Sequence, residues 1–388
     1  MSNKAIDVNS NSAILSAVLL GTLGVLSFIV QPGLVQAFVT ELAVGEPRAV
    51  DLAGIEMLGL ALATIILAVG GTRLDWRHIT LAGLVFSIIG NCGSAFFAGQ
   101  DSSMFASMRF VAGFGQGIII SISFTFVGLT KKVDRNLGIY LVSLLTYGAF
   151  MIWQLPNIIA GIGLQGVFYT FAVLTGLGLL TINHLPRGAE DRQEFSPLAR
   201  QLPMILLLVA MLAILAYNMA IGIAWAILFL VGLKAGLSEQ VVANALFWSQ
   251  VTAIFGAIGS IVLSEKISRF VPLFGGIILS IICIALLLDS PSYMEFLIAI
   301  CGFNFLWNFS LPFLLATVGD FDLKGRMMPI AIALQMIGLG IAPIIAARLI
   351  GDGSYWSAEM ATIIFFIVSL VLLAVPMLRH RYLLKTHR

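Results

Sequence analysis

Two opposite charges lie inside otherwise apolar stretches of this sequence, Glu56 and Arg109. An ionisable side chain is costly within a bilayer, so such residues usually pair, face a cavity or take part in function. Counting from the nearer ends of their apolar stretches places the two at similar depth. A carboxylate that alternates between an arginine and a proton could couple proton movement to another event. The alternative, which we rank second, is a static ion pair that braces two helices.

Amide and indole side chains recur at helical spacing in a second group of residues. Asn304, Trp307 and Asn308 are spaced i, i+3, i+4, which places them on one helix face. Two amides and an indole make a poor lipid-facing surface, so they favour contact with a polar solute, with interhelical hydrogen bonding as the alternative. Further solute-binding candidates are Asn218, Trp225, Tyr147 and Gln154, with Gln31, Gln250 and Gln335 in second rank.

Acidic and basic residues also share two short polar turns. Asp75 and Arg77 follow the second long apolar stretch, and Glu265, Lys266 and Arg269 follow the eighth. Similar turns at matched positions indicate a parallel repeat of six-span units. We expect these charged residues to act in gating.

The composition is that of a membrane protein. Hydrophobic residues make up 60% of the 388 residues and charged residues only 10%, with a mean hydropathy of +1.04, whereas soluble proteins are about one quarter charged. The net charge of +2 and the lack of a Lys/Arg-rich tract argue against binding to nucleic acid.

The residue pattern gives little indication of a metal site, a disulfide bond or a catalytic site. The cysteines are far apart without a CxxC motif, and all the histidines fall at the ends of apolar stretches or in the tail. The chain also lacks the GxxxxGK[ST] loop of an ATP-driven pump. We therefore expect no cofactor, no metal and no enzymatic activity.

The elements that must position these residues are membrane-spanning helices of about 20 residues each. No secretory signal precedes the first of them, so we expect it to be retained. The twelve predicted spans are 13–40, 52–71, 79–98, 103–129, 137–160, 164–184, 204–232, 241–263, 271–288, 295–318, 329–350 and 359–378. The short turn Gly161–Gly163 separates the fifth from the sixth.

Basic residues predict the orientation of these spans. With the N-terminus inside, only Arg48, Arg109, Lys234 and Arg348 of the 21 Lys and Arg residues fall outside cytoplasmic segments. This bias follows the positive-inside rule. We expect a multi-pass protein of the cell inner membrane with both termini in the cytoplasm.

The domain organisation follows from the longest polar connection, Pro186 to Pro203. A charged, proline-bounded segment between two six-span blocks is typical of a linker. We predict an all-α integral membrane protein with a six-helix bundle at residues 1–185, a cytoplasmic linker at 186–203 and a second six-helix bundle at 204–388.

These features together resemble the major facilitator superfamily over nearly the whole chain. The fourth span, with Arg109, Gly113 and Gly115, is similar to the family's R-x-x-x-G-x-G pattern, and the turn at Glu265–Arg269 is similar to its D-R-x-G-R pattern. The resemblance implies that Arg109 takes part in proton coupling and that spans one, four, seven and ten line a central cavity. The fifth span departs from the glycine-proline motif of many antiporters. Gly113 and Gly117 also form a small-xxx-small face on which another helix can pack closely.

The expected function is secondary active transport of a small organic solute by alternating access, coupled to protons. We expect a monomer in the lipid bilayer whose partners are the solute and protons. The alternatives are a multidrug efflux transporter, a passive facilitator or channel, and a nontransporting membrane receptor. A sugar carrier ranks lower, because its cavity helices would usually carry more polar and aromatic residues.

Overall fold

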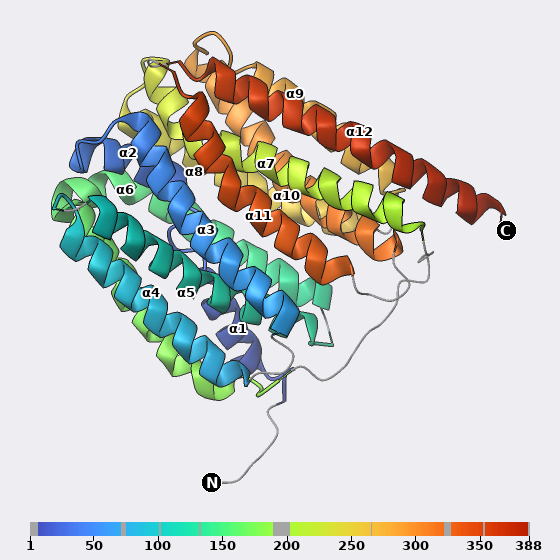
Figure 1. Cartoon of the computed structure of the whole chain (residues 1–388), viewed down its shortest axis with the longest axis horizontal. Coiled ribbons are helices and arrows are strands. Elements are labelled where there is room, and N and C mark those ends of the chain that lie inside the picture. The colour runs from blue at the N-terminus through green and yellow to red at the C-terminus, as the bar shows by residue number, and fades with distance from the viewer. Residues whose placement is uncertain are drawn as a thin grey trace. The chain divides into compact units, whose positions relative to one another are not determined.

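The computed structural model describes residues 7–70, 75–100, 102–131, 133–188, 202–264, 266–321, 327–351 and 354–386. Within these ranges the secondary structure is helical and includes no strand (Figure 1). The chain divides into two compact units, Met1–Arg192 and Gln193–Arg388. Most of the predicted linker, residues 189–201, lies outside the described residues, so the domain limits of 1–185 and 204–388 stay a prediction.

The first unit begins with a broken helix. The sequence predicted one span over residues 13–40. In the structure this span consists of two helices, because α1 (Asn11–Leu23) ends before a turn segment and α2 (Gln31–Glu41) begins after it. Pro32 at the start of α2 has no N–H to donate, which suits the first turn of a helix. Polar groups freed by such a break must find partners elsewhere in the protein.

The other elements of the first unit are α3 (Glu46–Gly70), α4 (Trp76–Phe97), α5 (Ser102–Gly128), α6 (Val133–Leu177) and the 3-10 helix η2 (Gly178–His184). Gly163 interrupts the 45-residue α6 with φ 68° and ψ 173°, a conformation that glycine adopts without steric cost. The predicted boundary between the fifth and sixth spans is therefore confirmed at this glycine.

The second unit consists of α7 (Met204–Lys234), α8 (Glu239–Ser264), α9 (Phe270–Ala285), α10 (Tyr293–Phe321), α11 (Met327–Leu349) and α12 (Trp356–Thr386). Prolines lie inside α10, α11 and α12, at positions 312, 343 and 376. Such prolines are tolerated in membrane helices, where neighbouring groups satisfy the freed carbonyls.

Nine helices in the described part of the chain are long and apolar enough to cross a membrane. The segment Arg135–His184 covers 50 residues with the break at Gly163, which is enough for two crossings. With the broken pair α1 and α2, and with the shorter α9, the count agrees with the twelve predicted spans. The chain is a multi-pass membrane protein.

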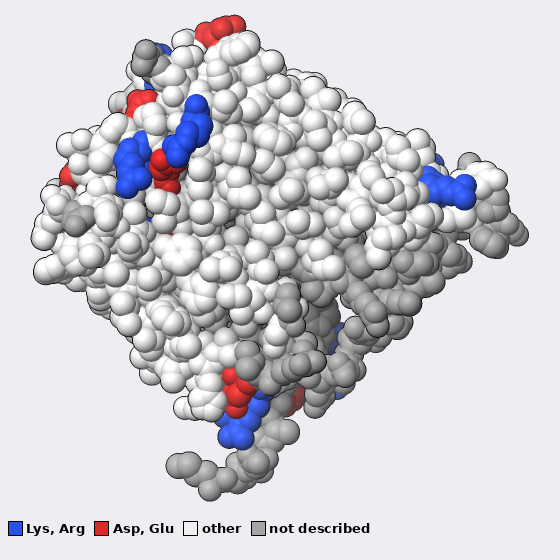
Figure 2. Space-filling model, viewed as in Figure 1, with Lys and Arg blue, Asp and Glu red and all other residues white. Residues whose placement is uncertain are grey.

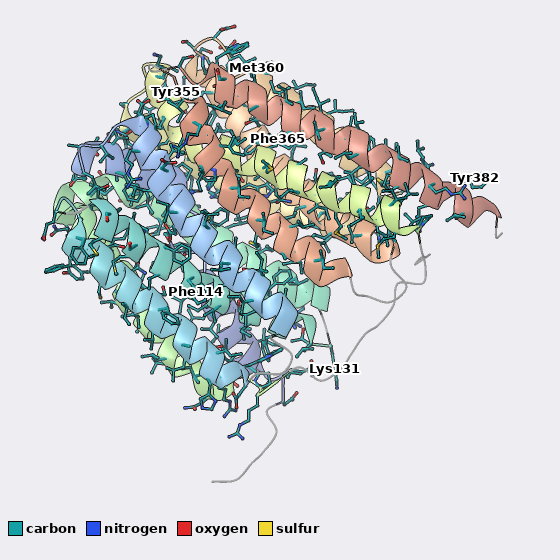
Figure 3. All side chains as sticks on the ribbon, in the orientation of Figure 1. Phe114, Lys131, Tyr355, Met360, Phe365 and Tyr382 are labelled. Atoms are coloured by element: carbon teal, nitrogen blue, oxygen red, sulfur yellow. The ribbon has the colours of Figure 1, made fainter. Side chains whose placement is uncertain are left out.

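The surface agrees with this assignment. Lys, Arg, Asp and Glu occupy only a few places on the face drawn in Figure 2. Large apolar side chains are exposed along the helices, as Val371 and Val375 of α12 are. Tyr355 and Tyr382 lie near opposite ends of α12 (Figure 3), where aromatic rings commonly sit at membrane–water interfaces.

Glycines allow α5 to lie unusually close to its neighbours in the first unit. A Cβ atom on Gly113 would clash with the carbonyl of Glu56, and one on Gly117 would clash with the carbonyl of Leu60. The predicted small-xxx-small face is therefore real, and it packs on α3. This close approach brings the side chains of α3 and α5 within direct contact at the level of Glu56.

Candidate functional site

Glu56 and Arg109 form a buried ion pair in the first unit. Arg109 Nη2 lies 2.5 Å from Glu56 Oε1, and the two residues are only 0% and 4% exposed. The contact expected from the sequence is thus present between α3 and α5. Two buried charges are retained only when they neutralise each other and their remaining polar atoms are well placed, because desolvating both is expensive.

Helix α4 holds the other side of the guanidinium. Arg109 Nη1 donates to Asn91 Oδ1 at 3.1 Å and to Ser94 Oγ at 3.3 Å. Asn91 Nδ2 donates to the Ser87 carbonyl at 2.9 Å, and Ser94 donates to the Gly90 carbonyl at 2.7 Å. The arginine is therefore positioned by a buried polar stripe on α4 as well as by its carboxylate partner.

An aromatic cluster of Phe38, Phe105, Phe168 and Phe171 covers the arginine. The guanidinium carbon lies 4.6 Å from the centroid of the Phe168 ring, a cation–π contact. Phe168 in turn packs on Phe105 at 5.8 Å and on Phe38 at 6.3 Å between ring centroids. All four rings are at most 1% exposed, so they keep water from the ion pair on this side.

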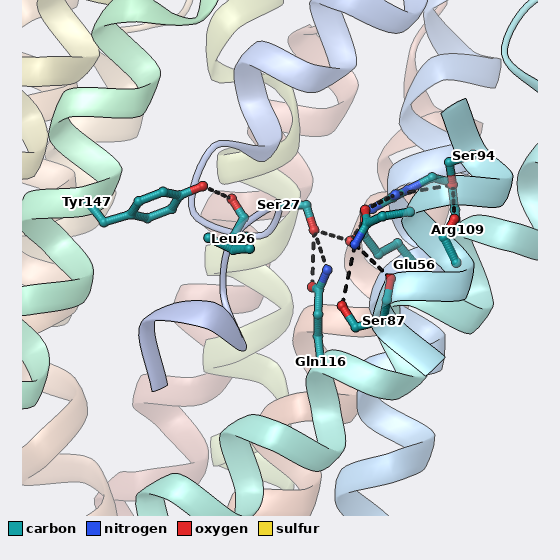
Figure 4. A network of polar contacts seen from close by, with 10 residues as sticks. Leu26, Ser27, Glu56, Ser87, Ser94, Arg109, Gln116 and Tyr147 are labelled. Atoms are coloured by element: carbon teal, nitrogen blue, oxygen red, sulfur yellow. Dashed lines mark hydrogen bonds and ion pairs between the residues drawn. The ribbon is translucent and has the colours of Figure 1, made fainter. Parts of the chain in front are cut away.

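The break between α1 and α2 supplies the remaining partner of Glu56. Ser27 lies in this break, and its hydroxyl donates to the Glu56 carboxylate (Figure 4). Ser27 Oγ also lies 3.1 Å from Gln116 Oε1 and 2.9 Å from Gln116 Nε2. The carboxylate is thus held by the break, by Arg109 and, through Ser27, by a second residue of α5.

Tyr147, a predicted solute-binding residue, contacts the same break. Its hydroxyl donates to the Leu26 carbonyl at 2.8 Å, as Figure 4 also shows. This bond satisfies one of the backbone groups that the break leaves outside a regular helix. Gln154, predicted to share the face of Tyr147, accepts a bond from Asn157 on its own helix at 3.4 Å.

In the second unit, the predicted amide and indole residues come together. Trp225 of α7 and Trp307 of α10 make an edge contact with ring centroids 5.7 Å apart. Asn304 donates to Ser249 of α8 at 3.1 Å, and Asn308 donates to the Asn304 carbonyl at 3.0 Å. The arrangement offers aromatic faces beside amide groups, which is suitable for a solute with both polar and apolar parts.

Three further amide candidates have a buried polar atom without a hydrogen-bond partner among the described residues. These atoms are Gln31 Nε2 in the first unit and Asn218 Oδ1 and Gln250 Oε1 in the second. A buried polar atom without a partner is costly and calls for an explanation such as water or a ligand.

Residues of the two charged turns, which follow α3 and α8, form hydrogen bonds to other elements of their own units. Asp75 is the N-cap of α4 and accepts from the Arg77 N–H at 2.9 Å, while Arg77 Nε donates to the Leu185 carbonyl at 2.8 Å. In the second unit, Arg269 Nη1 donates to the Ala316 carbonyl of α10 at 2.7 Å. Lys266 is exposed, and Glu265 lies outside the described residues. A gating role for these residues stays a prediction.

Sequence reasoning missed the polar residues that surround the ion pair: Ser27, Ser87, Asn91, Ser94 and Gln116. The α4 members are spaced i, i+4, i+7 in an otherwise apolar span, a signal of one polar helix face that could have been noticed. Ser27 gave no such signal, because serine is common in membrane helices and its position depends on the break.

No protein-family model matches the sequence, and no curated protein matches it. Solved structures do match. A D-xylose-proton symporter aligns over 92% of this chain and 96% of its own, with a TM-score of 0.73 and 16% identity. The POT family transporter PepTSo aligns over 95% and 98%, with a TM-score of 0.74 and 10% identity. The major facilitator superfamily transporter FucP aligns over 94% and 98%, with a TM-score of 0.63 and 16% identity. Likeness over nearly the full length of each chain shows that this protein has the major facilitator fold.

Proposed function

We propose that this major facilitator fold serves secondary active transport of a small organic solute, coupled to protons through Glu56 and Arg109. The observation that carries the proposal is the buried ion pair, with its arginine fixed by α4 and its carboxylate close to the helix break. One of the similar solved structures is named a proton symporter, which supports the same mechanism.

The coupling chemistry follows from the burial of both charges. When Glu56 is ionised, it neutralises Arg109 at 2.5 Å. When Glu56 takes up a proton, this attraction is lost and α3 is no longer held electrostatically to α5. Arg109 keeps its bonds to Asn91 and Ser94 of α4. Proton binding would therefore remove the contact between α3 and α5 at Arg109 Nη2, while Nη1 stays bonded to α4.

Solute recognition is assigned to the amide and indole residues. Trp225 and Trp307 provide ring surface, while Asn304 and Asn308 provide hydrogen-bonding groups. Gln31 and Asn218 each have a buried polar atom that a solute could satisfy. Tyr147 and Gln154 complete the proposed set, and the turns at Asp75, Arg77, Glu265, Lys266 and Arg269 are proposed to act in gating.

The orientation is part of the proposal. Both termini are assigned to the cytoplasm of a cell with this protein in its inner membrane, on the basis of the Lys and Arg bias. The transporter is proposed to work as a monomer.

The test begins by finding a ligand. Purified protein is screened by thermal unfolding against a panel of metabolites that begins with D-xylose, because a ligand that binds only the folded state stabilises it by about 2.7 kcal/mol at a hundred times its Kd. The stabilising compound is then used in proteoliposomes with an imposed pH gradient. We expect uphill accumulation by the parent and by Glu41→Gln, a control at an exposed carboxylate.

Glu56→Gln separates the alternatives. An amide resembles the protonated acid, so the variant should still exchange solute across the membrane but should not accumulate it. Accumulation equal to that of the parent would make Glu56 a structural brace and disprove coupling at this residue. A parent that only equilibrates the solute, whatever the pH gradient, would be a passive facilitator.

A further inference from the structure

The Ser27 hydroxyl lies between two groups that can accept its single proton. One is the Glu56 carboxylate, and the other is Gln116 Oε1 at 3.1 Å. Gln116 Nε2, at 2.9 Å, can instead donate to Ser27 Oγ. Ser27 and Gln116 are 1% and 0% exposed, so bulk water is not available to replace any of these bonds.

With Glu56 ionised, only one pattern of hydrogen bonds satisfies the three groups. A carboxylate accepts and cannot donate, so Ser27 must direct its proton to Glu56. The serine oxygen then accepts the N–H of Gln116 Nε2. The bonds run from Gln116 through Ser27 to Glu56.

With Glu56 protonated, the pattern reverses. The carboxylic acid now has an O–H that needs an acceptor, and Ser27 Oγ is already in contact with it. Ser27 can accept this bond if it rotates its own proton to Gln116 Oε1. The two atoms of the Gln116 amide both lie within hydrogen-bonding distance of Ser27 Oγ, so the reversal needs little or no movement of carbon, nitrogen or oxygen atoms.

We propose that Ser27 and Gln116 form a reversible hydrogen-bond relay that keeps Glu56 attached to the α1–α2 break in both of its protonation states. The proposal rests on the proposed function, in which Glu56 carries the proton. One proton is added to Glu56, the ion pair with Arg109 is lost, and the Ser27 hydroxyl changes its acceptor without breaking its O–H bond. Ser27 and Gln116 are thus positioning residues for Glu56.

The relay determines which contact between helices is lost when Glu56 is protonated. Arg109 of α5 is the charged group in contact with Glu56 among the described residues, and its loss as a partner separates α3 from α5 electrostatically. The break stays joined to α3 through Ser27, and to α6 through the bond from Tyr147 to the Leu26 carbonyl. Because Ser27 also stays bonded to Gln116 of α5, protonation removes the direct charge contact between α3 and α5 but leaves both helices joined through the break.

Infrared difference spectroscopy between high and low pH tests the relay without a solute. The parent protein in proteoliposomes should show a protonated carboxyl C=O band that is missing in Glu56→Gln. Ser27→Ala should move this band to higher frequency, because the acid loses its hydrogen-bond acceptor. Ser27→Thr keeps a hydroxyl and should restore the band. Thr22→Val is the matched control, since it removes a hydroxyl bonded to Ser143 on α6 and not to Glu56.

Gln116→Leu tests the second half of the relay. Without Gln116 Oε1, the Ser27 proton has no alternative acceptor, so protonation of Glu56 becomes less favourable. We expect the Glu56 band to appear at a pH about one unit lower, a tenfold weaker proton affinity. A Glu56 band that neither Ser27→Ala nor Gln116→Leu alters would overturn the relay. If no band depends on Glu56 at all, proton coupling through Glu56 itself fails, and the relay fails with it.

Discussion

The same helix crossing occurs once in each unit, with different side chains. In the first unit, Gly59 of α3 lies against the carbonyl of Phe110 on α5. In the second, Gly256 of α8 lies against the carbonyl of Phe305 on α10. Both contacts are so close that a Cβ atom on either glycine would clash with that carbonyl. The two crossings therefore share one backbone arrangement.

The residues at matched positions in these crossings differ in charge. Arg109 precedes the contacted phenylalanine in the first unit, and Asn304 does so in the second. Three residues before the glycine stands Glu56 in one case and Ala253 in the other. One crossing thus holds an ion pair, while the other holds an asparagine that bonds to Ser249. Packing is repeated at the two crossings and electrostatics is not, because only the first crossing holds an ion pair among the described residues.

The largest effect is expected from removing one charge of the ion pair. Arg109→Ala leaves the Glu56 carboxylate buried without its cation, which should lower the free energy of unfolding by about 3–5 kcal/mol. Asn304→Ala, at the matched neutral position, should cost only about 0.5–1.5 kcal/mol for one hydrogen bond. Both losses can be measured by denaturant unfolding in detergent.

The control for this comparison removes both charges together. Glu56→Gln with Arg109→Gln leaves no uncompensated charge, so it should recover most of the stability lost in Arg109→Ala while remaining unable to accumulate solute. Equal destabilisation by Arg109→Ala and Asn304→Ala would mean that the charges do not distinguish the two crossings.

A somewhat smaller effect is expected when charge is introduced into the neutral crossing. Ala253→Glu places a carboxylate at a fully buried position and should lower stability by several kcal/mol, unless the acid stays protonated. Adding Asn304→Arg should recover part of that loss by rebuilding the ion pair. A double variant that is less stable than Ala253→Glu alone would contradict the equivalence of the crossings.

A still smaller loss of stability, equal in both units, is expected when each contact glycine is replaced by alanine. Gly59→Ala and Gly256→Ala each force a methyl group against a backbone carbonyl, which should cost about 1–3 kcal/mol. Gly70→Ala is the control, because a Cβ atom there has nothing within 4 Å. Thermal unfolding measures all three variants, and a large cost in only one unit would show that the crossings are packed differently.

The smallest effect on stability should come from Trp307→Ala, which tests the proposed solute contact of α10. Loss of ring contact should weaken solute affinity by about 0.5–1.5 kcal/mol while expression stays near normal. Trp248→Ala, at a half-exposed tryptophan of α8, is the control. Affinity unchanged in Trp307→Ala would move the solute site away from α10.

The sequence predicted the ion pair because few other charged residues lie within the predicted spans. Glu56 and Arg109 are opposite charges in apolar stretches, and each needs a partner. Hydropathy predicted the approximate limits of the membrane spans. The spacing of Asn304, Trp307 and Asn308 predicted an amide and indole face on α10. Its contact with Trp225 could not be predicted, because that contact depends on how α7 and α10 pack.

The position of the break between α1 and α2 could not be predicted, because hydropathy does not change across it. Residues 24–30 are mostly apolar and would suit a continuous helix. The break depends on tertiary contacts, among them Gly24 against the backbone of Ile120 and the Tyr147 bond to Leu26. The role of Ser27 depends on this break, so it was missed for the same reason.

The broken first span also has a consequence for how the protein enters the membrane during synthesis. α1 has 13 residues and α2 has 11, which correspond to about 20 Å and about 17 Å of helix, and neither covers the roughly 30 Å hydrocarbon core of a bilayer. As the chain emerges, the insertion machinery can only accept the two pieces together, most simply as the continuous helix that the hydropathy favours. The partners that break this helix, on α5 and α6, are synthesised later. The mature shape of the first span is therefore acquired after insertion, when the rest of its bundle has arrived.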